Sequence, residues 1–153
     1  MLPNLIQELQ ESSNPEQAKN LQRFFKIGAG QYGEGDIFLG IKVPKQREIA
    51  KKYIDLPLPR IQELLNSKIH EYRLVWLLIL VDKFKKADET EKGDIFNFYL
   101  KNTKNINNWD LVDLSAPNII GNFLLNKKKD ILYKLAESKS LWEKRIAIIS
   151  TST

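Results

Sequence analysis

Apolar residues recur every three or four positions along most of the chain, which is the spacing of a buried helix face. Small polar residues and prolines mark where the segments begin. Asn14-Pro15-Glu16 combines an N-cap, a proline at the first helical position and an acidic first turn. It predicts a helix that continues through Phe25 and stops at Gly28. Residues 28–40 are rich in glycine and predict a loop with a short extended or turn segment.

Of the next three predicted helices, the first two begin at prolines. Pro44 begins the first of them, and its inner side holds Ile49, Ala50 and Tyr53. Pro57 and Pro59 start the second, which carries Ile61, Leu64 and Leu65. The third covers residues 69–86 and is apolar on nearly all sides, so we expect it to be central.

Short capped helices continue to the C-terminus. One runs from about Asp88 to Leu100. Asn107 or Asn108 caps a short helix that holds Trp109 and Asp113.

The last third of the chain predicts three more helices. Ser115 caps the first, with Pro117 in its first turn, and residues 129–137 form the second. Ser140 caps the third and has Glu143 three residues later, as in a capping box. Because no run of residues alternates as a strand does, the sequence predicts an all-α fold.

A repeat of 36 residues runs through the second half of the chain. Arg73, Trp109 and Arg145 are evenly spaced, and each lies near the start of a helix that follows another helix. This rhythm is typical of an α-α solenoid of stacked helix pairs. Equivalent positions then lie in a row, so we expect these three side chains to line one continuous face.

Composition narrows the class of protein. The 153 residues suffice for one domain with a substantial core, and 42% hydrophobic and 28% charged residues are ordinary for a globular protein. The net charge of +5 fits a partner that carries phosphate. The start of the chain lacks the pattern of a signal peptide, and the longest apolar run, Leu74 to Val81, is too short to span a bilayer. We expect a soluble cytoplasmic protein.

Several kinds of site are excluded or disfavoured. Without cysteine the chain has no disulfide and no thiolate metal site, and a single histidine, His70, argues against a histidine-based metal centre. Residues 28–33 match G-x-G-x-x-G, but a helix and not a strand precedes them, so we reject a dinucleotide site.

Trp109 and Asp113 are the first candidates for chemistry. They are four residues apart in a predicted helix, so both side chains lie on one face. An indole attracts cations through its π-face, and a carboxylate stabilises positive charge or positions water. Together they suit a cationic ligand or a transition state that develops positive charge. The alternative is that Trp109 packs in the core and Asp113 is solvated or caps a helix.

Arg145 lies one repeat after Trp109. Its guanidinium suits bidentate contact with phosphate, and it would offset the repulsion between a carboxylate and a DNA backbone. The alternatives are a salt bridge to Asp113 or Glu143, or simple exposure. Lysine clusters such as Lys127-Lys128-Lys129 are typical of solvated helix ends, and would form a backbone-binding track only where several share one face.

Motifs along the chain resemble those of DNA alkylation repair enzymes. They occur in order from about residue 20 to the end, at suitable spacing. They are Tyr32 to Asp36, Phe38 to Pro44 with Arg47, His70 to Arg73, Asn108 to Asp113, and Leu141 to Arg145.

This resemblance implies a superhelix of HEAT-like repeats that holds duplex DNA on its concave face. It also implies hydrolysis of the N-glycosidic bond of alkylated purines, notably 3-methyladenine and 7-methylguanine, without a metal or another cofactor. The catalytic aspartate of the family falls on Asp113, the tryptophan of its cleft on Trp109, and its active-site arginine on Arg145. Among the basic residues, we expect Arg73, Arg47 and Lys144 to contact DNA.

Relative to the family, the chain ends soon after the helix that carries Arg145, so we expect a single helical-repeat domain over residues 1–153 that is truncated at its C-terminus. We expect it to act as a monomer on duplex DNA that contains alkylated bases. Two alternatives stay open, namely a DNA-binding relative without glycosylase activity and a helical-repeat scaffold for another protein.

Overall fold

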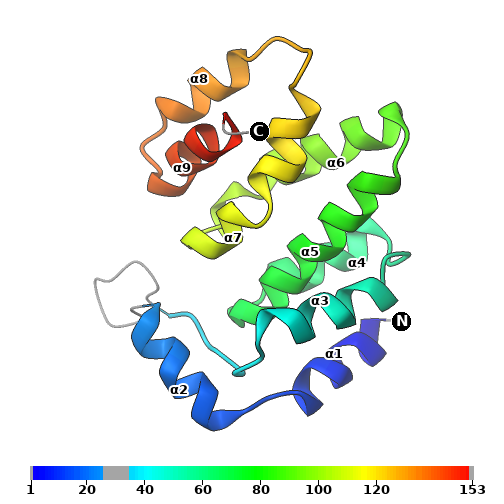
Figure 1. Cartoon of the computed structure of the whole chain (residues 1–153), viewed down its shortest axis with the longest axis vertical. Coiled ribbons are helices and arrows are strands. Elements are labelled where there is room, and N and C mark those ends of the chain that lie inside the picture. Colours follow the sequence, from blue (N-terminus) through cyan, green and yellow to red (C-terminus); the bar gives the residue numbers. More distant parts are fainter. Residues whose placement is uncertain (1, 26–34, 152–153) are drawn as a thin grey trace. The chain divides into compact units, whose positions relative to one another are not determined.

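The structure is a computed structural model that describes residues 2–25 and 35–151. In these residues the regular secondary structure is helical, apart from one isolated parallel bridge between Ile37 and Ile69. The prediction of an all-α fold is therefore confirmed. The α-helices are α1 (Leu2–Glu11), α2 (Pro15–Phe24), α3 (Val43–Lys52), α4 (Leu58–Leu65), α5 (His70–Lys86), α6 (Glu89–Lys101), α7 (Trp109–Asp113), α8 (Asp130–Ala136) and α9 (Leu141–Ser150) (Figure 1). Two short turns accompany them, the 3₁₀ turn η1 (Thr103–Asn105) and the π-helical turn η2 (Pro117–Gly121).

The chain forms two compact units, Met1–Asp82 and Lys83–Thr153, and the division falls inside α5. A single domain built as a HEAT-like superhelix stays a prediction.

In the first unit, α1 is not among the helices predicted from the sequence. Its buried residues are Leu2, Leu5 and Leu9, which follow the i, i+3, i+7 spacing of an amphipathic helix. This face is covered in part by α3, which packs beside α1 (Figure 1). The helical spacing of these leucines is visible in the sequence, but no N-cap residue marks the start of this helix.

The start of α2 is as predicted, but its end is not. The side chain of Asn14 accepts hydrogen bonds from the N–H groups of Glu16 and Gln17, both at 3.1 Å. The helix ends at Phe24, and the predicted stop at Gly28 lies outside the described residues. Phe25 leaves the helical conformation, and its buried ring stacks on Phe38 with a centroid distance of 5.2 Å. Burial of this ring favours an earlier end of the helix.

A buried carboxylate organises the segment before α3. Glu71, in the first turn of α5, accepts hydrogen bonds from the N–H groups of Leu39, Gly40 and Ile41 at 2.9, 2.8 and 3.2 Å. Gly40 has a φ of +85°, and a Cβ at this position would lie 2.0 Å from the carbonyl oxygen of Asn14. The segment therefore packs against the start of α2 at a point where only glycine fits.

The remaining helix starts of this unit follow the prolines. Pro44 and Pro59 occupy the first turns of α3 and α4, as predicted. Ile49, Ile61 and Leu65 are fully or almost fully buried, whereas Tyr53 is half-buried. In α5 every residue from His70 to Val81 is buried, which confirms the prediction of a central helix.

In the second unit, capping side chains again mark the starts of several helices. Asp88, Asn108 and Ser140 cap α6, α7 and α9 through their side chains. Ser115 was predicted as a cap, but this prediction is wrong, because its hydroxyl bonds back to the carbonyl of Leu111 and the chain continues into η2.

Of the predicted capping box, one half is present. The Ser140 hydroxyl accepts from the N–H of Glu143, but the Glu143 carboxylate accepts from the hydroxyls of Thr103 and Ser138 and does not return to Ser140. In this way the start of α9 is tied to the segment that follows α6.

The three residues of the predicted 36-residue repeat lie on helices, but not at equivalent positions. Arg73, Trp109 and Arg145 lie on α5, α7 and α9, each of which follows another helix. However, Arg73 is the fourth residue of its helix, Trp109 the first and Arg145 the fifth. The three positions are therefore not equivalent on their helices.

Gly40 and Gly35 provide a matched test of this packing. Both have a positive φ, but a Cβ on Gly35 would meet nothing within 4 Å. We expect Gly35→Ala to pay only the cost of the left-handed backbone, about 1–2 kcal/mol. Gly40→Ala adds a clash with backbone atoms, and overpacking of this kind typically costs about a further 1–3 kcal/mol. Urea unfolding of both variants measures the difference, and equal losses would contradict the close approach at Gly40.

Candidate functional site

The centre of the candidate site is an ion pair between α7 and α9, which pack against each other in the second unit. Arg145 donates from Nε to Oδ1 of Asp113 at 2.8 Å and from Nη2 to Oδ2 at 2.7 Å. Both side chains are accessible, with 38% of Arg145 and 32% of Asp113 exposed. The two residues that were grouped from the sequence thus face each other in a bidentate geometry at the surface of this unit.

Trp109 is the first residue of α7, four positions before Asp113. Residues four apart share one side of a helix, so the indole and the carboxylate lie along the same side of α7. The Trp109 residue is half-buried. The alternative in which Trp109 is sealed in the core therefore does not hold, and part of the residue stays accessible to a ligand.

α7 has only five residues, and a helix of this length is not stable without tertiary contacts. Asn108 accepts a hydrogen bond from the N–H of Trp109, and Leu111 and Val112 are fully buried. These contacts hold one side of α7 in the core. Trp109 and Asp113 consequently lie on the side that remains accessible.

Two buried hydroxyl groups support the end of α7. Ser115 Oγ donates to the carbonyl of Leu111 at 2.5 Å, and the hydroxyl of Tyr99 lies 2.8 Å from Ser115 Oγ. Both residues are fully buried. Burial raises the pKa of Tyr99 well above its usual range, so its hydroxyl stays protonated and can donate to Ser115. No motif in the sequence links these two residues, which are 16 positions apart.

Arg145 is permanently charged at this site. Its hydrogen bonds to Asp113 raise the pKa of the guanidinium further above its ordinary value. Glu143, the other carboxylate considered as a partner from the sequence, accepts from Thr103 and Ser138. The salt bridge of Arg145 is therefore made with Asp113, which is one of the alternatives to a phosphate contact that the sequence left open.

The other basic residues that were expected to contact DNA differ in burial. Lys144, beside Arg145 on α9, is exposed, and so is Arg47 on α3 in the first unit. Both side chains are accessible to a phosphate.

Arg73 does not lie on an accessible face, so the prediction that it lines the surface is wrong. Only 4% of the residue is exposed, and Nη2 lies 2.8 Å from Oδ2 of Asp36, which is also buried. Oδ2 of Asp36 lies 3.8 Å from Nδ1 of His70, whose ring stacks on Phe38. A buried charge needs a partner of opposite sign. Arg73 supplies that charge to Asp36, and its role here is structural.

A search of protein-family models matches residues 5–153 to the family described as DNA alkylation repair enzyme. The chain belongs to this family. The resemblance seen in the motifs is confirmed, and family membership gives the chain a role in the repair of alkylated DNA. No curated protein matches the chain.

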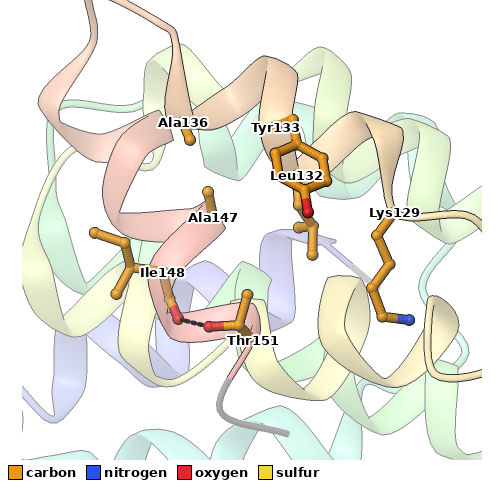
Figure 2. A pocket seen from close by; sticks show the side chains of 7 residues that line it. All are labelled: Lys129, Leu132, Tyr133, Ala136, Ala147, Ile148 and Thr151. Carbon is orange, nitrogen blue, oxygen red and sulfur yellow. Dashed lines mark hydrogen bonds between the residues drawn. The ribbon is translucent and has the colours of Figure 1, made fainter.

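One apolar pocket lies elsewhere in the second unit of this DNA alkylation repair enzyme. Its volume is about 260 Å³, and it is an open pocket between α8 with the preceding Lys129 and the last turns of α9. Figure 2 shows Leu132 and Tyr133 on one side and Ala147, Ile148 and Thr151 on the other. The ammonium of Lys129 donates to the carbonyl of Leu124 at 2.6 Å. Since no carboxylate lines the pocket, we do not place the repair chemistry there.

Among residues 2–25 and 35–151, no group of three or more histidine, aspartate or glutamate side chains could hold a metal ion. In the same residues, no helix has the length and apolar character needed to cross a membrane.

The two arginine ion pairs are expected to contribute to stability to different extents. Removing one partner of a buried pair typically costs about 3–5 kcal/mol, because the other charge is left buried. An exposed pair contributes at most about 1 kcal/mol. We therefore expect Arg73→Ala to lower the free energy of unfolding strongly and Arg145→Ala to change it by less than about 1 kcal/mol. Urea denaturation of both variants checks this, and a large loss with Arg145→Ala would make that pair structural.

Proposed function

We propose that this member of the family is a DNA glycosylase that hydrolyses the N-glycosidic bond of alkylated purines in duplex DNA, with 3-methyladenine and 7-methylguanine as substrates. One observation carries the proposal. The bidentate pair of Asp113 and Arg145 is accessible, and its Asp113 lies on α7, the helix whose first residue is the half-buried Trp109.

The chemistry of the substrate explains why these residues suffice. A purine alkylated at N3 or N7 carries a positive charge, and it leaves with the bonding electrons as a neutral base. The sugar then develops positive charge, as in other glycoside hydrolyses, and a water molecule adds through its oxygen to C1′ and loses one proton to the solvent. Because the leaving group is already activated by its charge, the enzyme needs no strong general acid.

Asp113 would stabilise the charge that develops on the sugar. A fixed carboxylate near the reacting carbon lowers the energy of a cationic transition state, and it also accepts a hydrogen bond from the attacking water. The backbone of α7 at this point is held by the contacts of Leu111 and Val112 and by the Ser115 hydroxyl. The carboxylate is therefore anchored on a short, well-supported element.

Trp109 and Arg145 would hold the damaged nucleotide from two sides. The face of an indole attracts a cationic group at a distance of up to about 6 Å. Trp109 would therefore favour the charged lesion over a neutral purine. The planar guanidinium of Arg145 can donate two parallel hydrogen bonds to a phosphate, as it does to Asp113 in this structure.

The role of Asp113 in catalysis can be tested by removing its charge. Asp113→Asn keeps the size of the side chain and removes its charge, so we expect base release from methylated duplex DNA to fall by about 100-fold or more. Duplex binding should persist. Release is measured as free methylated purine under single-turnover conditions, with the whole chain.

Asp130→Asn is the matched control, because Asp130 is exposed at the start of α8. It should release base at the wild-type rate. Equal release by the wild type and Asp113→Asn would remove Asp113 from the mechanism. Duplex binding without any release by the wild type would favour a non-catalytic relative, and absence of both would favour a protein-interaction scaffold.

Contacts of basic side chains with the DNA backbone can be tested through the salt dependence of binding. If Lys144 and Arg47 contact phosphates, Lys144→Ala and Arg47→Ala should each reduce the slope of log K against log salt concentration by about 0.9. Arg60→Ala is the control, because Arg60 is exposed and lies 3.6 Å from Glu63. An unchanged salt slope for Lys144→Ala or Arg47→Ala would exclude that residue as a phosphate contact.

A further inference from the structure

We propose that the Asp113–Arg145 pair is a latch that is closed in the free protein and is opened by a phosphate of the DNA backbone. The inference rests on the proposed function for the identity of the anion. It adds a regulatory step to the same site, since the carboxylate of Asp113 becomes available only when DNA has engaged Arg145.

In the closed latch, the charge of Asp113 is neutralised by Arg145. Both oxygens of Asp113 accept hydrogen bonds from Arg145, at 2.8 and 2.7 Å. With a full positive charge at this distance, the carboxylate presents little net charge to a third group. In the state seen here, Asp113 therefore cannot effectively stabilise a cation on a sugar. The paired geometry is a resting state of the site.

The ion pair that forms the latch is weak. With about a third of each side chain exposed, water screens the pair and can replace its hydrogen bonds. Solvent-accessible ion pairs typically contribute about 1 kcal/mol or less, which corresponds to about a fivefold change in an equilibrium constant. An anion with modest affinity for Arg145 is therefore enough to open the pair.

A phosphodiester is the anion that would replace Asp113 on Arg145. A guanidinium donates to a phosphodiester with the same parallel geometry that it uses for a carboxylate. Glu143, on the same helix, does not compete, because its two oxygens accept from Ser138 and Thr103. The exposed Lys144 next to Arg145 adds a second positive charge that attracts a phosphate.

Opening of the Asp113–Arg145 pair requires no movement of the backbone. α7 is held by Leu111 and Val112 in the core and by the hydrogen bonds of Ser115 with Leu111 and Tyr99. Rotation of the Arg145 side chain therefore frees the carboxylate without displacing it.

A double-mutant cycle with unmodified duplex DNA tests the latch. The dissociation constants of the wild type, Asp113→Asn, Arg145→Ala and the double variant are measured at one salt concentration. Asp113→Asn should bind DNA about two- to fivefold more tightly, because Arg145 no longer has to leave a charged partner. In the Arg145→Ala background, the same substitution should give little or no gain.

The cycle separates the latch from simple repulsion. If Asp113 only repels phosphate, Asp113→Asn gives the same gain in both backgrounds, and this result overturns the latch. A wild-type affinity equal to that of Asp113→Asn also overturns it, as does failure of the wild type to bind duplex DNA at low salt. Unchanged urea midpoints of Asp113→Asn and Arg145→Ala show that the effect is not unfolding.

The outcome is independent of base release, because the DNA carries no lesion. Coupling between Asp113 and Arg145 in a protein that releases no methylated purine would keep the latch and remove the glycosylase proposal. Release of methylated purine without coupling between Asp113 and Arg145 would keep the glycosylase proposal and remove the latch.

Discussion

The site depends on a constraint that acts on a helix of five residues. α7 is too short to be stable by propensity, so packing must hold it in place. Leu111 and Val112 bury one side, Asn108 caps the start, and Ser115 with Tyr99 supports the end. Because these contacts occupy the inner side of α7, Trp109 and Asp113 are directed to the outer side. The geometry of the candidate site follows from the way in which the short helix is buried.

The two arginine ion pairs show how burial decides the role of a charged residue. Arg73 and Asp36 are buried, and their pairing is needed because a lone charge in the core is costly. Arg145 and Asp113 have the same chemistry but remain about one-third exposed, so their pairing adds little to stability. An exposed pair that contributes little to the fold is free to exchange partners. This is the physical basis for assigning function to the second pair and structure to the first.

Helix starts could be predicted from the sequence to a large extent. Asn14, Asp88, Asn108 and Ser140 are residues that satisfy free N–H groups through their own side chains, and they do so in the structure. Local chemistry of this kind is visible in a single sequence. The start of α1 lacks such a residue, and this helix was missed although its leucines have helical spacing.

The features that were mispredicted depend on tertiary contacts. The end of α2 is set by the burial of Phe25 against Phe38, and the role of Ser115 is set by Tyr99, 16 residues away. Arg73 has the same spacing as Trp109 and Arg145, but its burial depends on Asp36. Spacing can place a residue on a helix, whereas burial of its side chain depends on partners that are remote in the sequence. For the same reason, the sequence offered both Asp113 and Glu143 as salt-bridge partners of Arg145, and only the structure selects Asp113.

The most direct test of the account is to observe the side chains of the site by NMR while unmodified duplex DNA is added to the whole chain. The account predicts that the Arg145 Nε–H and Trp109 indole N–H resonances shift together, whereas the indole resonance of the fully buried Trp76 stays in place. Saturation with DNA that leaves the Arg145 and Trp109 resonances unchanged would contradict the account, because DNA would then bind elsewhere.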